Sequence, residues 1–151
     1  MGTKTTIRPI KAQDIGEVLD MVRGLANHHN DTATLTPEQL SRDALGPAPW
    51  LHILVAETAQ TLVGYAALCP LAQLQFGVRG MDMHHLFVRA SSRGTGIGRA
   101  LIDASLVVAT AQNCGYMTVG THPDNTAAAN VYLAAGFDRL DPPGPRFRIK
   151  L

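Results

Sequence analysis

Apolar positions in the first third of the chain follow a helical period. After Asp14 they fall at residues 15, 18, 19, 22 and 25, and this spacing predicts an amphipathic helix with one buried face. The preceding segment TIRPIKAQD predicts a short strand that ends near Pro9. In LTPEQLSRDAL, Thr36 is suited to cap a second short helix with Pro37 at its first position, and the segment GPAP ends it.

From Trp50 onward the pattern changes to short apolar runs. WLHILVAE and TLVGYAALCPLA, separated by the polar turn TAQ, predict an antiparallel hairpin, and MDMHHLFV predicts a third strand in the same region. Helical spacing returns in GIGRALIDASLVVATAQNCG, where Gly115 is the expected cap. YMTVGTH then predicts a strand, and NTAAANVYLAAG predicts a helix ended by Gly136. FDRL and RFRIKL are expected to close the chain as two strands around the turn DPPGP.

The resulting order of elements is β-α-α-β-β-β-α-β-α-β-β, which predicts an α/β layer fold with a mixed sheet. The chain has 151 residues and contains no internal repeat, linker or low-complexity tract. We therefore expect one domain over residues 1–151.

Composition narrows the class of protein. Apolar residues make up 46% of the chain and charged residues 17%, and no window approaches the ~20 uninterrupted apolar residues of a membrane-spanning helix. The net charge of +1 comes from interspersed acids and bases, which form no basic stripe for nucleic acid. Cys69 and Cys114 have no Cys-x-x-Cys partner, a pattern typical of reduced thiols. We expect a cytoplasmic protein that binds neither nucleic acid nor a membrane.

The segment RGTGIGR, residues 93–99, places three alternating glycines between an apolar strand and a helix. The amide groups at the start of a helix favour phosphate, and glycines let phosphate oxygens approach the backbone. A Walker A loop is excluded because no Gly-Lys-Ser/Thr follows, and the dinucleotide fingerprint fails at its third glycine. By itself, the glycine spacing is also compatible with a surface turn.

Two motifs carry a resemblance to a known family. Arg93-x-x-Gly96-x-Gly98 resembles the coenzyme A pyrophosphate loop of the GNAT superfamily of N-acetyltransferases. Farther along, NTAAANVYLAAGF is similar to the family's Asn-x-x-Ala-x-x-aliphatic-Tyr-x-x-x-Gly-Phe segment, with Asn125 and Tyr132 at the matching positions. The segments IRPIKAQD, LTPEQL, LVAE and LVGYAAL resemble in particular the branch that includes spermidine/spermine N-acetyltransferase.

The resemblance implies the GNAT fold: a single domain with a mixed, mostly antiparallel sheet of six to seven strands and about four helices. It also implies acetyl-coenzyme A as the acyl donor, with no metal, and a homodimer by analogy with other family members. Backbone amides of the strand before the loop would hold the pantetheine arm and the thioester carbonyl. The residues expected to bind coenzyme A are Leu86, Phe87, Val88, Arg93, Gly94, Thr95, Gly96, Ile97, Gly98, Arg99, Asn125 and Ala128.

Three residues are candidates for catalysis. Tyr132 matches the family tyrosine whose hydroxyl lies near the sulfur, although its spacing also suits a core aromatic. Strand alternation predicts one face for residues 82, 84, 86 and 88, with His85 on the other. His84 is the better general base at neutral pH, and Asp82 would attract the substrate ammonium group. An ordered water is the alternative base.

The histidines separate this chain from the polyamine-acetylating branch, which has an acidic pair where His84 and His85 stand here. Fewer negative charges argue against a polyamine substrate. In the family layout, His28, His29 and Asp31 border the acceptor site, although a solvated helix end explains them equally well. No histidine or cysteine spacing suits a metal.

The sequence therefore predicts direct acetyl transfer from acetyl-coenzyme A to a primary amine of a small molecule. The alternatives are a catalytically idle domain that senses acyl-coenzyme A, and an acetyltransferase of protein N-termini or lysines.

Overall fold

The computed structural model describes residues 3–151, which form two compact units, one up to Gly120 and one from Thr121 onward. Each unit is described by itself. The helices and strands of the first unit are β1 (Thr5–Pro9), α1 (Ile15–His28), α2 (Pro37–Leu45), β2 (His52–Thr58), β3 (Thr61–Gln73), β4 (Val78–Val88), α3 (Ile97–Ala111) and β5 (Cys114–Val119). The second unit contains α4 (Thr126–Ala134).

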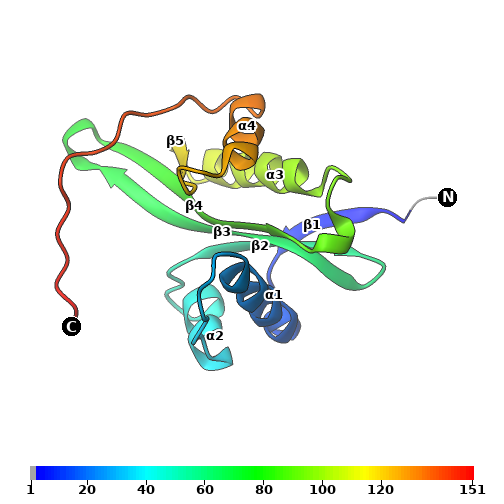
Figure 1. Cartoon of the computed structure of the whole chain (residues 1–151). Helices are drawn as coiled ribbons and strands as arrows, with labels where there is room; N and C mark the ends of the chain where they lie inside the picture. The colour runs from blue at the N-terminus through cyan, green and yellow to red at the C-terminus, as the bar shows by residue number, and fades with distance from the viewer. Residues whose placement is uncertain (1–2) are drawn as a thin grey trace. The chain divides into compact units, whose positions relative to one another are not determined.

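The first unit is built on a five-stranded mixed sheet with the strand order β1-β2-β3-β4-β5 (Figure 1). The first three pairs of neighbouring strands are antiparallel, and β4 and β5 are parallel. A parallel pair needs a crossover, which here contains α3. The predicted α/β fold with a mixed sheet and four helices is confirmed.

The prediction of six to seven strands is wrong. FDRL and RFRIKL form no strand, and no backbone hydrogen bond is present beyond Phe137 in the described part of the chain. The side chains of Phe147 and Ile149 are 94% and 84% exposed. Alternation of apolar and polar residues gives a segment strand propensity, but a strand also needs a partner for its backbone groups.

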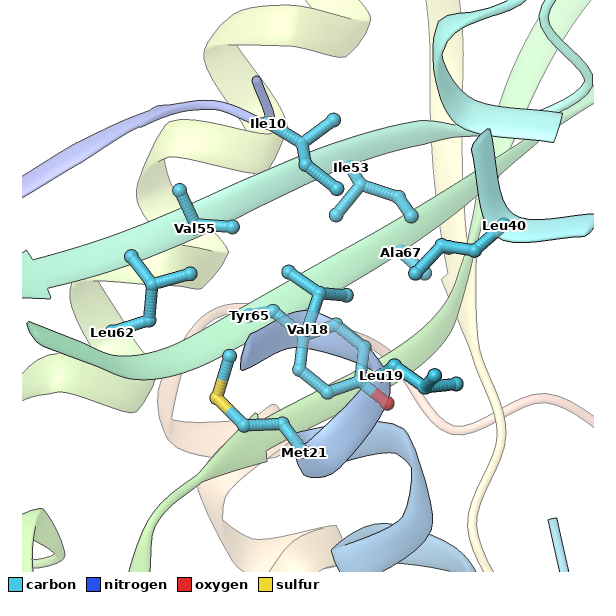
Figure 2. Packing of buried hydrophobic residues seen from close by; sticks show 10 residues of the cluster. All are labelled: Ile10, Val18, Leu19, Met21, Leu40, Ile53, Val55, Leu62, Tyr65 and Ala67. Carbon is cyan, nitrogen blue, oxygen red and sulfur yellow. The ribbon is translucent and has the colours of Figure 1, made fainter. Parts of the chain in front are cut away.

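Helices cover both faces of the sheet. Figure 1 shows α1 and α2 on one face and α3 on the other. Figure 2 shows the core under α1 and α2, where Val18 and Met21 of α1 pack with Tyr65 of β3. Ile97 and Leu101 of α3 belong to a second cluster. Burying each such side chain contributes ~1.5–3 kcal/mol, so the two clusters fix the helices on the sheet.

Residues 62–68 of β3 are all buried because helices cover both faces of this part of the sheet. This double burial explains the continuous apolar run in the sequence. Beyond Cys69 the β3–β4 hairpin becomes exposed and ends in a turn at Leu74–Phe76.

The helix ends follow local sequence signals only in part. The Thr36 hydroxyl accepts a hydrogen bond from the Gln39 amide, which confirms the predicted cap of α2. The predicted cap of α3 at Gly115 is wrong, because this helix ends at Ala111 and Gly115 lies within β5. Asn113, with φ of 62°, makes the left-handed turn instead, a conformation that asparagine tolerates.

Across residues 3–151, no helix is both long enough and apolar enough to cross a bilayer.

Candidate active site

The candidate site is centred on a bulge in β4. Ala67 of β3 lies opposite His85, but the next residue, Leu68, lies opposite Met83. His84 is therefore the extra residue of a β-bulge and has no partner on β3. Because side chains alternate along a strand, one extra residue reverses the faces of all positions on its far side.

The bulge brings two histidine rings together. The rings of His84 and His85 are stacked, with centroids 4.3 Å apart and planes inclined by 16°. The prediction that these two side chains point apart is therefore wrong, because it assumed an uninterrupted alternation.

Asp82 also changes face at the bulge. It lies opposite Cys69 of β3, whereas His85 lies opposite Ala67. Cys69 and Ala67 are two positions apart and share a face of the sheet, so Asp82 and His85 share that face as well. The predicted common face of residues 82, 84, 86 and 88 is not formed. Instead, the bulge puts Asp82 on the same face of the sheet as His85.

Asp82 is held by the neighbouring strand. Its Oδ1 accepts a hydrogen bond of 2.7 Å from the hydroxyl of Thr118 on β5. Burial raises the pKa of the Cys69 thiol, and the charge of Asp82 raises it further. The carboxylate therefore has a fixed position and supplies negative charge to this part of the sheet.

His85 contacts a buried tyrosine. The hydroxyl of Tyr65 on β3 lies 3.0 Å from His85 Nδ1, and the Tyr65 side chain is fully buried. Burial lowers the pKa of His85 to about 4, and the neighbouring His84 and His29 lower it too. His85 is therefore neutral at neutral pH.

The edge of β4 is open beyond the bulge. Pairing with β5 runs from Arg79 opposite Cys114 to Met83 opposite Val119. From residue 85 to residue 88, β4 has a strand neighbour only on the β3 side among the described residues. The unpaired edge of a strand offers backbone donors and acceptors to a ligand. This stretch contains Leu86, Phe87 and Val88, whose amides are predicted to hold the pantetheine arm and the thioester carbonyl.

The glycine loop directly precedes α3 and depends on left-handed backbone. Gly94 has φ of 76°, and Gly96, the cap residue of α3, has φ of 85°. A Cβ at either position would meet no atom within 4 Å, so these glycines are required for their backbone conformation. The first helical bond runs from the Ala100 amide to the Gly96 carbonyl at 3.0 Å. The amides of the first turn point out of the helix, which suits an anion.

Side chains on either side of the glycines hold the loop. Arg93 donates from Nε to the Val88 carbonyl at 3.1 Å, and the Thr95 hydroxyl donates to the Ser92 carbonyl. Arg99 forms an ion pair of 3.0 Å with Asp103 one helical turn later.

In the second unit, the Asn-x-x-Ala motif begins α4. The Asn125 side chain accepts a hydrogen bond of 3.1 Å from the Ala128 amide and so caps the helix. The Tyr132 ring lies edge-on to Phe137, with centroids 5.9 Å apart, and burial raises the pKa of Tyr132. The motif is thus a compact local structure, and the catalytic role of Tyr132 stays a prediction.

His28 and His29 lie at the end of α1, with ring centroids 5.6 Å apart and both side chains exposed. His29 is close enough to His85 to affect its pKa. Asp31 follows them and donates from its amide to the Ala26 carbonyl. Within residues 3–151, no three histidine, cysteine or acidic side chains are grouped to hold a metal ion.

Sequence reasoning missed Tyr65 and Thr118. Both lie in apolar runs that predict core strands, and nothing in the runs indicates their polar partners. Their roles depend on the register of β3, β4 and β5, which one sequence does not specify.

Comparisons with known proteins agree with this geometry. The model of the acetyltransferase (GNAT) family matches residues 21–137. Thialysine N-epsilon-acetyltransferase of Bos taurus is 29% identical over 144 residues, which cover 89% of this chain and 84% of the relative. L-methionine sulfoximine/L-methionine sulfone acetyltransferase of Pseudomonas paraeruginosa is 32% identical over 138 residues, or 88% of this chain and 80% of the relative.

Among solved structures, aminoglycoside N-acetyltransferase AAC(6')-Iy in complex with CoA has the same fold. Its TM-score is 0.77 at 20% sequence identity, and the match covers 100% of this chain and 98% of that one. An open β4 edge followed by a glycine-capped helix fits a protein that holds a thioester of coenzyme A. The chain belongs to the acetyltransferase (GNAT) family. It is therefore an acetyl-coenzyme A-dependent N-acetyltransferase by family, and such enzymes act on amines.

Proposed function

We propose that this chain transfers the acetyl group of acetyl-coenzyme A directly to the primary amine of a small molecule with an amino acid-like structure. The observation that carries the substrate class is the single carboxylate of Asp82, which lies on the same face of the sheet as His85 of the stacked pair. One carboxylate balances one ammonium group, whereas a polyamine brings several. Two relatives support this class, since they are named for thialysine and for L-methionine sulfoximine and sulfone.

The amine must lose a proton to become a nucleophile. Asp82 attracts the ammonium form electrostatically. The bound ammonium group first loses one proton to solvent, and the neutral nitrogen then attacks the thioester carbonyl carbon. His84, exposed at the bulge, accepts the second proton from the nitrogen and later releases it to solvent. Those amides among residues 86–88 that face the open edge of β4 stabilise the negative charge that develops on the carbonyl oxygen.

Collapse of the tetrahedral intermediate breaks the carbon–sulfur bond. The electron pair leaves with the sulfur, and Tyr132 donates its hydroxyl proton to the thiolate, so that free coenzyme A is released. Burial raises the pKa of Tyr132 and keeps this proton in place at neutral pH. The tyrosine then recovers a proton from solvent. No covalent acyl-enzyme is formed.

The substrate class is tested by changing the charge at the bulge. In His84→Glu, a second carboxylate joins Asp82, and we expect the ratio of kcat/KM for spermidine to kcat/KM for a lysine analogue to rise about tenfold. Losing His84 as the base lowers kcat/KM for both acceptors, so the ratio of the two values reports the effect of the added charge.

Gln75→Glu is the matched control, because it adds the same charge in the exposed turn at Leu74–Phe76. Its ratio should equal that of the wild type. A wild-type enzyme that already prefers spermidine would contradict the proposed substrate class.

A further inference from the structure

Tyr65 and His85 form a polar pair inside an otherwise apolar cluster. The Tyr65 side chain is fully buried among residues of α1, α2 and the sheet, as Figure 2 shows. Its hydroxyl has one hydrogen-bond partner within the described residues, His85 Nδ1 at 3.0 Å. A buried hydroxyl without a partner costs ~1–3 kcal/mol, so the pair is a stable part of the core.

The direction of this hydrogen bond follows from the chemistry of its partners. Burial raises the pKa of Tyr65, so its hydroxyl keeps its proton, and burial keeps His85 neutral. A neutral imidazole has one donor and one acceptor nitrogen. If Nδ1 carried the proton, the Tyr65 O–H would have no acceptor. Tyr65 therefore donates to Nδ1, and the His85 proton is on Nε2.

The His84 ring stacks on the His85 ring, which the hydrogen bond from Tyr65 holds in place. The two rings are nearly parallel, with centroids 4.3 Å apart, and His84 has no partner residue on β3. The titratable groups around His85 are Tyr65, His84 and His29, and Asp82 shares its face of the sheet. A protonated His85 would place a cation against His84. Its Nδ1 would also carry a proton and could no longer accept the hydrogen bond from the Tyr65 hydroxyl.

We propose that Tyr65 and His85 are a positioning pair for His84. The Tyr65 hydroxyl holds His85 in the Nε2–H tautomer and in one plane, and this plane holds the His84 ring beside the open edge of β4. The catalytic part of this inference rests on the proposed function, in which His84 takes the proton of the amine. Neither Tyr65 nor His85 touches the reacting atoms.

The first test is independent of activity. In ¹H–¹⁵N spectra of the histidine rings, we expect wild-type His85 to carry its proton on Nε2 and to stay neutral from pH 8 down to about pH 5. In Tyr65→Phe, both tautomers should appear, while the pKa of His85 should stay low because burial, its main cause, is unchanged. A wild-type His85 with its proton on Nδ1, or with a pKa near the ordinary value of about 6.5, would overturn the pair.

The second test is a double-mutant cycle on kcat. Tyr65→Phe and His85→Phe should each lower kcat by about tenfold and leave the KM for acetyl-coenzyme A unchanged, because both release His84 from its position. The double variant should be no slower than either single variant, since one residue acts through the other. Tyr116→Phe on β5 is the matched control and should retain wild-type kcat.

The outcomes separate this inference from the proposed function. If amines are acetylated and Tyr65→Phe retains wild-type kcat, the positioning pair is wrong and the proposed function stands. If no amine is acetylated, the proposed function fails, and the ring spectra alone decide whether Tyr65 sets the tautomer of His85.

Discussion

At the scale of single residues, His85 makes the stability of the protein depend on pH. A histidine in the unfolded chain binds its proton near a pH of about 6.5, whereas the pKa of folded His85 is about 4. Between these values the unfolded state binds more protons, so stability is present above pH 6.5 and is lost as the pH falls toward 4.

We expect this loss to be about 2 kcal/mol, because His85 is only partly buried and solvent screens part of the effect. Urea unfolding at several pH values measures it. In His85→Asn, whose side-chain oxygen can still accept from Tyr65, this part of the pH dependence should be absent. If the free energy of unfolding depended equally on pH in the wild type and in His85→Asn, the assignment to His85 would be contradicted.

From the sequence, Asp82 and His84 of β4 are candidate site residues, but their geometry does not follow from it. Asp82 and His84 were predicted as site residues from their place before the glycine loop. The bulge at His84 was not predictable, because it is set by the pairing of β3 with β4 and not by the pattern within β4. Because the hydrogen bond between Tyr65 and His85 also depends on strand pairing, it was not predictable either; the two residues lie 20 positions apart in sequence.

At the scale of elements, the glycine loop and α3 depend on one backbone conformation. Gly96→Ala forces a side chain into the left-handed region and should destabilise the fold by ~1–2 kcal/mol. It should also raise the Kd for coenzyme A several-fold, because the first-turn amides lose their orientation. Calorimetric titration with coenzyme A and urea unfolding measure the two effects.

Gly16→Ala in α1 is the matched control. A Cβ there meets no atom within 4 Å and the backbone is not left-handed, so this variant should be as stable as the wild type or more stable by ~0.5–1 kcal/mol. A Gly96→Ala protein that binds coenzyme A with unchanged affinity would show that the loop conformation is not required.

The C-terminal segment provides a second test at this scale. Residues 138–151 make no backbone hydrogen bond in the described structure, so their amides should exchange with deuterium at the rate of an unfolded chain. Residues 64–68 of β3 should be protected, since they are buried and paired with both β2 and β4. Protected amides at residues 146–151 would instead support the strand that the sequence predicts there.

Elements were predictable where local signals determine them. Thr36 with Pro37 fixes the start of α2, and helical spacing fixes α1 and α3. The expected strands FDRL and RFRIKL do not form. RFRIKL has the alternating pattern of a strand, but no neighbouring strand pairs with it in the described structure. Local propensity decides an element only when tertiary pairing is available.

At the scale of the whole molecule, the family follows from two separate motifs and the order of the sheet. Arg93-x-x-Gly96-x-Gly98 and the Asn125–Phe137 segment predict a ligand and a fold, and the family match over residues 21–137 bears out the family. The acceptor is harder to predict, because under our proposal it depends on a few charges near the β4 bulge. Thialysine, methionine sulfoximine and aminoglycoside acetyltransferases share this fold or family while their names give different acceptors.

The most direct measurement is the release of free coenzyme A thiol from acetyl-coenzyme A across a panel of amines. The panel contains lysine analogues and other amino acids, polyamines, aminoglycosides, arylalkylamines and peptides with free N-termini, and Tyr132→Phe is measured beside the wild type. We predict release with amino acid-like amines, and a kcat about 100-fold lower in Tyr132→Phe with an unchanged KM for acetyl-coenzyme A. Tight binding of acetyl-coenzyme A without release for any amine, or release favouring peptides, would contradict the account.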